Sequence, residues 1–240
     1  MKLRDFKVLT FDCYGTLIDW ETGLFHGLRA LVAGSGRAMS RDQALEEFGR
    51  LEFAQQQKTP AMPYSHLLAV VYRQLAEAWG IALSNEQAVA FGASVAAWPE
   101  FPDSPPALQY LKRHYKLVIL SNVDRVSFRA SNARLEVDFD AIYTAQDIGS
   151  YKPSDRNFEY LIRRLAEDFT FDKTDVLHVA QSLLHDHAPA NRAGLASAWI
   201  DRRHAAEGWG ATMPPTATPH YDFRFESLAG LVAAHEREGE

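Results

Sequence analysis

FKVLTFDCYGTL, residues 6–17, decides how this chain is expected to fold. Five of the six residues before Asp12 are hydrophobic or β-branched, which is typical of a short strand buried on both faces, as in a parallel sheet. The apolar run stops at Asp12, and Gly15 provides a turn soon after it. Because open α/β sheets bind their ligands at the carboxyl ends of such strands, we expect Asp12 to lie in a ligand site.

The composition limits the class of protein and its partners. Of the 240 residues, 47% are hydrophobic, which is enough for a sizeable packed core. The formal net charge is −6 and Lys and Arg form no run longer than a pair, so we expect neither a nucleic acid nor a membrane as partner. A single cysteine, Cys13, excludes an internal disulfide and a cysteine-based zinc site. No stretch resembles a signal peptide or a membrane span, and we expect a cytoplasmic protein.

Residues 18–99 are predicted to form helices with no convincing strand among them. Ser40 is a typical N-cap for one of these helices, and the prolines at 60 and 63 must interrupt them, since proline removes a backbone hydrogen bond. Beyond Pro99, strands and helices alternate, which implies right-handed crossovers and a parallel sheet. The stretch from Gly208 to Pro219 is expected to be an exposed loop.

The expected fold is therefore α/β. A Rossmann-like parallel sheet with helices on both faces takes residues 1–17 and 100–240, and a helical domain, residues 18–99, is inserted after the first strand. After that first strand, the apolar runs predict further strands at 116–122, 141–144, 175–180 and 196–201, with helices at 107–114, 126–135, 157–168, 188–194 and 227–235.

Polar side chains follow several of these strands at the point where the apolar run stops. In a parallel sheet all these ends lie at one edge, so a carboxylate, a hydroxyl, a cation and a second acid should converge there. That combination is expected for covalent catalysis by a carboxylate nucleophile, here Asp12. The other polar residues of this edge are Ser121, Asn122, Lys152, Gln181, Ser182 and Asp186.

Together these residues carry a resemblance to a known family. The four motifs Asp12-Cys13-Tyr14-Gly15-Thr16-Leu17, Leu120-Ser121-Asn122, Lys152-Pro153 and Val179-Ala180-Gln181-Ser182 with Asp186 resemble, in order, those of the haloacid dehalogenase superfamily. The resemblance is closest to the 2-haloacid dehalogenases of type II. It implies that the helical insertion is a cap that closes over the active site, and cap-mediated homodimerisation would be an analogy with the family.

Tyr14 bears on the reaction that the resemblance implies. Phosphatase members of the superfamily carry an aspartate at this position, which protonates the leaving alcohol, whereas dehalogenase members resemble this chain in carrying tyrosine. A phenol with an ordinary pKa of about 10 cannot replace that aspartate at neutral pH. A halide leaves without a proton, so the tyrosine favours hydrolysis of a carbon–halogen bond in a small 2-haloacid.

The metal expectation follows from the fourth motif. Phosphatase members bind Mg²⁺ with the nucleophile and acids of this motif, where the chain has Gln181 in place of the usual first acid. Hard cations prefer carboxylate oxygens, so we expect no required metal, with Mg²⁺ held by Asp12 and Asp186 as the weaker alternative. His178, His185 and His187 lack a carboxylate triad and are not expected to form a zinc site.

The resemblance also implies a role for each residue. Asp12 attacks the substrate carbon to form an ester, and Lys152 keeps Asp12 ionised and stabilises the oxyanion when water hydrolyses the ester. Asp186 pairs with Lys152. The residues expected to orient the carboxylate and substrate are Thr16, Ser121 and Asn122, those expected to hold the water are Gln181, Ser182 and Asp186, and those expected to bind the substrate are Tyr14, Trp20, Arg50, Gln181 and Ser182.

Some family positions differ in this chain. Haloacid dehalogenases place an arginine on the cap before a Leu-Glu-aromatic triplet, but the matching position before Leu51-Glu52-Phe53 is Phe48. Arg50 is near in sequence, although it points about 200° away around the helix. The other candidate substitutes on the cap are Arg29, Gln55, Lys58 and Tyr64. The alternatives to a 2-haloacid dehalogenase are a hydrolase of another small organic acid or of a phosphate ester, and a catalytically idle binding member.

Overall fold

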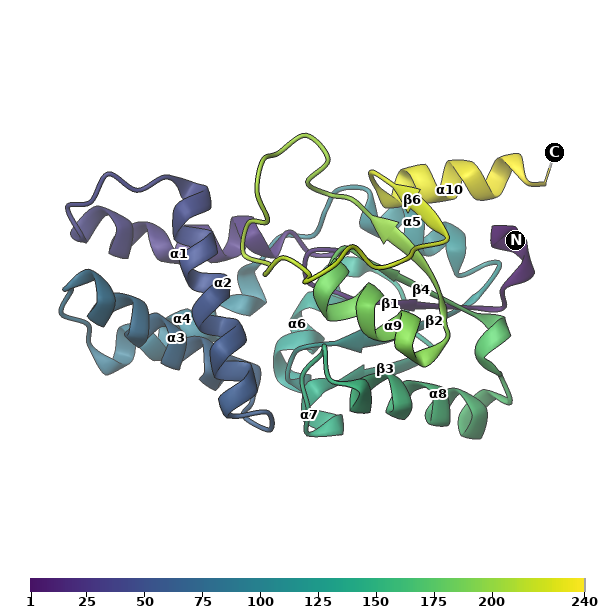
Figure 1. Ribbon diagram of the computed structural model, residues 1–240, viewed down its shortest axis with the longest axis horizontal. Helices are drawn as coiled ribbons and strands as arrows, with labels where there is room; N and C mark the ends of the chain where they lie inside the picture. Colours follow the sequence, from purple (N-terminus) through teal and green to yellow (C-terminus); the bar gives the residue numbers. More distant parts are fainter. Residues whose placement is uncertain (240) are drawn as a thin grey trace.

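A six-stranded parallel sheet forms the centre of the computed structural model, which describes residues 1–239. Figure 1 shows the sheet with helices on both of its faces and a separate group of helices beside it. The strands follow the spatial order β3-β2-β1-β4-β5-β6, all parallel, which confirms the predicted Rossmann-like α/β fold. Their bounds are β1 Val8–Phe11, β2 Lys116–Ser121, β3 Ala141–Thr144, β4 Val176–Ala180, β5 Ala196–Ile200 and β6 Phe223–Phe225.

The order of the strands reverses at β1, which lies between β2 and β4. Phe11 pairs with Ile119 on one side and with Val179 on the other, so the ends of the three strands are level. Ligands of open α/β sheets bind in the crevice at such a reversal. Asp12, which follows β1, therefore lies in the position where this architecture places chemistry.

Both faces of the sheet are covered, which explains the unbroken apolar runs in the sequence. Leu9 and Phe11 face the helices α5, α6 and α10, whereas Val8 packs toward α8 on the opposite face. Alternate residues of a strand point to opposite faces, so a strand covered on both sides carries no polar stripe. The helices of this domain are α5 Ser104–Leu111, α6 Arg125–Leu135, α7 Ala145–Ile148, α8 Asp155–Phe169, α9 Ala188–Ala193 and α10 Leu228–Arg237, with 3-10 turns at Leu3–Asp5 and Lys173–Asp175.

The helical insertion runs from α1 to a 3-10 turn, and Figure 1 shows it to one side of the sheet. The Ser40 side chain accepts a hydrogen bond from the backbone N–H of Gln43, so α2 begins where the sequence predicted an N-cap. The elements are α1 Trp20–Gly34, α2 Arg41–Lys58, α3 Tyr64–Trp79, α4 Asn85–Ala93 and the turn Ser94–Ala97. None of the helices in residues 1–239 has the length and apolarity needed to cross a bilayer.

Two segments that run side by side join the insertion to the sheet domain. The backbone N–H of Asp19 donates to the carbonyl of Pro99 at 2.8 Å, and that of Phe101 donates to the carbonyl of Leu17 at 3.0 Å. The Ser104 hydroxyl also donates to the Leu17 carbonyl, at 2.8 Å. The outgoing and returning chains therefore hold each other at the hinge between the two parts.

Several features were not predicted from the sequence, among them the helix α7 and the three described next. The strand β6 pairs with β5 alone, at one edge of the sheet. A π-helical turn, Leu183–His187, precedes α9. In the stretch expected to be an exposed loop, Gly210, Ala211 and Thr212 are buried. A Cβ atom at Gly49 of α2 would lie 2.1 Å from the Ala211 carbonyl oxygen, so this glycine is what allows the loop to lie against α2.

Candidate active site

Asp12 is held by groups from three different segments. Gly15 has φ of +94°, which turns the chain back after β1 so that the Thr16 hydroxyl donates to Asp12 Oδ2 at 2.8 Å. The Thr16 hydroxyl itself accepts the backbone N–H of Gln181 at 2.9 Å. The Lys152 ammonium donates to Asp12 Oδ1 at 2.9 Å. Both carboxylate oxygens thus have a defined donor.

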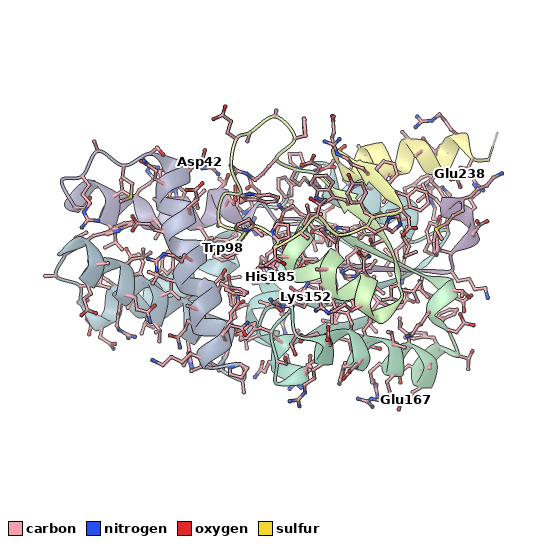
Figure 2. The ribbon with its side chains drawn as sticks, viewed as in Figure 1. Asp42, Trp98, Lys152, Glu167, His185 and Glu238 are labelled. Atoms are coloured by element: carbon pink, nitrogen blue, oxygen red, sulfur yellow. The ribbon has the colours of Figure 1, made fainter. Side chains whose placement is uncertain are left out.

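The Lys152 ammonium lies between two carboxylates. Its Nζ donates to Asp12 Oδ1 at 2.9 Å, to Asp186 Oδ1 at 2.6 Å and to the Leu120 carbonyl at 2.9 Å. These three contacts use the three N–H donors of the ammonium group. The exposed fractions of the side chains are 1% for Lys152, 8% for Asp12 and 1% for Asp186. The trio is therefore a buried ionic cluster, and Figure 2 shows where Lys152 lies in the molecule.

Burial is the largest influence on the protonation of these groups, because it disfavours their charged forms. At Lys152, burial lowers the pKa, but the two carboxylates together raise it by more, so the pKa is raised. At Asp186, burial raises the pKa, but the Lys152 ammonium and His178 together lower it by more, so the pKa is held well below its usual range. At Asp12, burial and the charge of Asp186 outweigh Lys152 and Thr16, and the pKa is raised. With one ammonium and two ionised carboxylates, the trio carries a net negative charge.

A buried histidine on β4 lies within hydrogen-bonding distance of Asp186. Thr10 and His178 pair directly across β1 and β4, and the Thr10 hydroxyl lies 2.8 Å from His178 Nδ1. His178 Nε2 lies 3.0 Å from Asp186 Oδ1. Both Thr10 and His178 are fully buried. The sequence analysis did not assign His178 to the site, and the signal that could have found it is its register with Thr10.

Asn122 and Ser121 were expected to orient the Asp12 carboxylate, but their side chains are placed differently. The Asn122 side chain donates to the Lys152 carbonyl at 3.0 Å and accepts the Lys152 backbone N–H at 2.7 Å. Asn122 therefore positions the backbone of Lys152 and makes no contact with the Asp12 carboxylate. The buried Ser121 hydroxyl has no hydrogen-bond partner within residues 1–239. Of the three residues expected to orient Asp12, only Thr16 donates a hydrogen bond to its carboxylate.

A cavity of about 50 Å³ lies beside Asp12, between the sheet domain and the insertion. Most residues predicted for the site line it: Asp12, Tyr14, Trp20, Asn122, Lys152, Gln181, Ser182 and Asp186. Five residues that the sequence analysis had not placed in the site, or had named only as a substitute, complete the wall: Glu52, Gln56, Tyr64, His185 and Thr212. The carboxyl edge of the sheet thus meets α2, α3 and the loop that contains Thr212.

The expectation for Arg50 is corrected by its position. Arg50 is exposed and lines a different surface depression beside Glu46 and Glu47. Phe48 is fully buried in the insertion, with its ring 6.2 Å from that of Phe91. Positions on α2 that are four residues apart share a face, so the residues that follow Phe48 toward the cavity are Glu52 and Gln56. Of the four substitutes, Tyr64 lines the cavity, and Arg29, Gln55 and Lys58 do not.

Tyr14 contributes a half-buried aromatic ring to the cavity wall. Its hydroxyl lies 2.9 Å from the Ser131 hydroxyl of α6, and its ring packs edge-on against Trp98 with centroids 5.6 Å apart. Burial raises the pKa of Tyr14 well above its usual value. The phenol is therefore neutral at physiological pH and is directed toward α6.

His185 presents a neutral imidazole to the cavity. The Ser182 hydroxyl caps the π-helical turn by accepting the His185 backbone N–H at 3.0 Å, and it lies 3.1 Å from His185 Nδ1. Burial lowers the pKa of His185 to about 4. Nε2 is buried and has no hydrogen-bond partner in the described chain, which leaves it for a ligand. Figure 2 labels His185 close to Lys152.

Arg202 supports the loop that carries Thr16. Its guanidinium donates twice to the Thr16 carbonyl, from Nη2 at 2.9 Å and from Nε at 3.2 Å. It also pairs with Asp103 at 2.8 Å and stacks on the Phe101 ring at 4.0 Å. This residue follows β5, and nothing in the sequence pattern had connected it with Asp12.

The donor set is a poor match for Mg²⁺. This ion prefers several carboxylate and water oxygens in octahedral geometry. Asp12 and Asp186 both hydrogen-bond to the Lys152 ammonium, and Gln181 provides an amide where a further acid would be needed. Within residues 1–239, no three His, Cys, Asp or Glu side chains cluster in a way that could hold a metal.

Several solved structures have a fold similar to that of this chain. An L-2-haloacid dehalogenase, PA0810, shares 20% identity with a TM-score of 0.76, covering 98% of this chain and 100% of that chain. The L-2-haloacid dehalogenase from Xanthobacter autotrophicus with chloropropionic acid covalently bound shares 17%, also with a TM-score of 0.76, over 98% and 99%. The putative HAD-hydrolase YfnB from Bacillus subtilis, bound to magnesium, shares 16% with a TM-score of 0.72, over 96% and 99%.

At these identities the structural neighbours show a common fold. No curated protein sequence matched the chain. The family model for haloacid dehalogenase-like hydrolases matches residues 6–194, which include all four motifs. The protein therefore belongs to the haloacid dehalogenase-like hydrolases.

Proposed function

We propose that this hydrolase cleaves a carbon–halogen bond of a small 2-haloacid through an ester of Asp12. The observation that supports the proposal most is the Lys152 ammonium, which lies 2.9 Å from Asp12 and 2.6 Å from Asp186. A carboxylate is a weak nucleophile in water, and holding it desolvated at a fixed angle removes much of the cost of attack. Lys152 and Thr16 provide that restraint from opposite sides of the Asp12 carboxylate.

In the first step, an oxygen of Asp12 attacks the substrate carbon. A carbon–oxygen bond forms while the carbon–halogen bond breaks, and the halide leaves with the bonding electron pair. This step needs no proton donor. It therefore suits a site in which Tyr14, a neutral phenol hydrogen-bonded to Ser131, occupies the position of a possible general acid.

In the second step, water attacks the carboxyl carbon of the ester. The Lys152 ammonium would stabilise the oxyanion, and Gln181, Ser182 and Asp186 are placed around the cavity to hold the water. Collapse of the intermediate releases a 2-hydroxy acid and regenerates Asp12, with one proton passing to solvent overall. We propose that no divalent cation takes part, because Lys152 already neutralises Asp12 and Asp186 in part.

One structural neighbour supports this chemistry. The Xanthobacter autotrophicus enzyme carries covalently bound chloropropionic acid in a chain of the same fold. A covalent adduct of a small acid is therefore compatible with this architecture. In the present chain, Asp12, Lys152 and Tyr14 support the proposal.

Halide release tests the proposal directly. The protein is incubated with each enantiomer of 2-chloropropionate and, separately, with para-nitrophenyl phosphate, with and without Mg²⁺, and chloride or phosphate is measured. We expect metal-independent chloride release that Asp12→Asn abolishes. Asp140→Asn, which alters a carboxylate that pairs with Lys112 and Lys116, is the matched control and should retain activity. Magnesium-dependent phosphate release that is lost in Asp12→Asn would refute the proposal.

A further inference from the structure

Glu52 and Tyr64 form the wall of the cavity that faces the sheet domain from the insertion. Both line the cavity together with Asp12, and their exposed fractions are 5% and 3%. The Tyr64 hydroxyl donates to Glu52 Oε1 at 2.7 Å. Phe48, one turn earlier on α2, lies inside the insertion. The cavity-facing position of α2 is thus an acid, where an anionic substrate would favour a cation.

The charges around the cavity make this acid significant. Asp12, Glu52 and Asp186 line it, and among the described lining residues Lys152 is the one Lys or Arg. With Glu52 ionised, the cavity would carry two net negative charges before any ligand entered. A substrate carboxylate would then meet strong repulsion in a site from which water is largely excluded.

We propose that Glu52 is a specificity-determining residue that admits an anionic substrate only when its carboxyl group is protonated, so that each substrate anion binds together with one proton. This inference rests on the proposed function, because it takes a 2-haloacid anion as the ligand. In its protonated form Glu52 is neutral and can donate a hydrogen bond to the ligand. Burial raises the pKa of Glu52 to about 7, so the change of state falls in the physiological range.

Other titratable groups face Glu52 and define what a pH titration will report. Burial raises the pKa values of the three tyrosines around it, and backbone hydrogen bonds from Ser65 and Ser127 hold the pKa of Asp124 down against burial. The pKa of Asp12 is also raised. A change of ligand affinity with pH can therefore be attributed to Glu52 only if a substitution of Glu52 removes it. The groups that line the cavity with Glu52 are Tyr64 from α3, Tyr14 after β1, Lys152 before α8, and Asp12, His185 and Asp186 from the sheet edge. Tyr151, before α8, interacts electrostatically with both Glu52 and Asp124 at the start of α6.

Calorimetry with product-like ligands tests the proposal without turnover. Lactate, the 2-hydroxy acid formed from 2-chloropropionate, and its neutral analogue lactamide are titrated into the protein in buffers of different ionisation enthalpy. From a pKa near 7, we expect lactate to take up about 0.9 proton at pH 8 and about 0.1 at pH 6, and its Kd to rise about sixteenfold from pH 7 to pH 8.5. Lactamide binding should take up almost no proton at either pH.

Two variants assign the proton to Glu52. Glu52→Gln keeps the shape and removes the charge, so proton uptake should disappear and lactate should bind about tenfold more tightly than to wild type at pH 8. Tyr64→Phe removes a hydrogen bond that favours the ionised form, so proton uptake should extend to higher pH. This second variant keeps the acid and provides a test if Glu52→Gln fails to fold.

Four results would overturn the proposal: no lactate binding at pH 6, no proton uptake by wild type at pH 8, uptake that persists in Glu52→Gln, or weaker lactate binding by Glu52→Gln at pH 8. The titration measures binding of a product and involves no chemistry at Asp12. Failure of halide release would therefore refute the proposed reaction while leaving this result to stand or fall separately.

Discussion

Replacing Lys152 with methionine removes the ammonium but keeps an unbranched side chain of similar length. In the wild type this ammonium is 1% exposed and donates to Asp12, Asp186 and the Leu120 carbonyl. The variant leaves two buried carboxylates facing each other without their cation. We expect it to be strongly destabilised and unable to release halide.

The size of the effect follows from the burial of the cluster. Removing one partner from a buried ion pair typically costs about 3–5 kcal/mol, because the remaining charge stays desolvated. In a chain of this length each kcal/mol lowers the Tm by about 2–4 °C, so the Tm should fall by roughly 6–20 °C at pH 7.5. Lys112→Met is the control, since Lys112 pairs with Asp140 while 33% exposed and should cost at most about 1 kcal/mol.

The pH dependence separates loss of charge pairing from loss of packing. Without the cation, the folded-state pKa values of Asp12 and Asp186 rise above the unfolded value of about 3.9. A carboxyl group whose pKa is raised by folding destabilises the protein above that raised pKa, and the penalty is relieved as the pH falls through it.

Urea unfolding at pH 7.5 and pH 5 measures this difference. The gap between Lys152→Met and wild type should be smaller at pH 5, and a second substitution, Asp186→Asn, should recover part of the stability at pH 7.5 but none of the activity. If Lys152→Met at pH 7.5 lies within about 1 kcal/mol of wild type, the ammonium does not hold the cluster together and the reasoning fails.

Three further substitutions test single contacts. Tyr14→Phe should keep halide release within about threefold of wild type, because a halide needs no proton donor; a loss of a hundredfold would assign proton transfer to the phenol. Arg202→Gln should lower kcat about tenfold with little change in KM, because it releases the Thr16 carbonyl and loosens the hydroxyl that holds the nucleophile; an unchanged kcat would contradict this role. Gly49→Ala should destabilise the protein by about 1–3 kcal/mol in thermal unfolding, since its Cβ would lie 2.1 Å from a carbonyl oxygen, whereas Gly34→Ala, with its nearest neighbour at 3.8 Å, should be close to neutral.

Much of the fold could be predicted because burial on both faces leaves a simple pattern. The strands β1, β2 and β4 are apolar without alternation, and helices alternate with them after residue 100. The strand β6 escaped prediction because it has only three residues, of which Phe223 and Phe225 are half-buried and Arg224 is exposed, and because it pairs with β5 alone. An alternation of three residues is too short to indicate a strand, and its strand conformation comes from a tertiary contact.

The part of the site around Asp12 could be predicted for a similar reason. Parallel strands bring their carboxyl ends to one edge, so Asp12 and Asp186 meet at the reversal between β1 and β4 whatever the details of packing. His178 was missed because its link to Asp186 depends on strand register, which decides that it lies opposite Thr10. Arg202 was missed because its contact with Thr16 joins residues far apart in the sequence through a loop.

The cavity residues that come from the insertion could not be predicted. Helical periodicity shows which residues share one face of a helix, but not what that face packs against. The stripe of Phe48, Glu52 and Gln56 runs along α2 from the interior of the insertion to the cavity. The resemblance to haloacid dehalogenases puts Phe48 where those enzymes carry an arginine, yet Phe48 packs against Phe91 and does not line the cavity. Which residue of the stripe reaches Asp12 depends on how α2 is docked.

The way in which α2 packs against the sheet domain decides which side chains are available to bind a substrate anion. Lys152 is the one Lys or Arg among the described residues of the cavity wall, and its three N–H groups already serve Asp12, Asp186 and a carbonyl. A substrate carboxylate must then be bound largely by neutral donors, among which the unpartnered Nε2 of His185 faces the cavity. Neutral donors compensate poorly for repulsion between like charges. The ionisation of Glu52, more than the number of hydrogen bonds available, therefore decides whether an anion can enter.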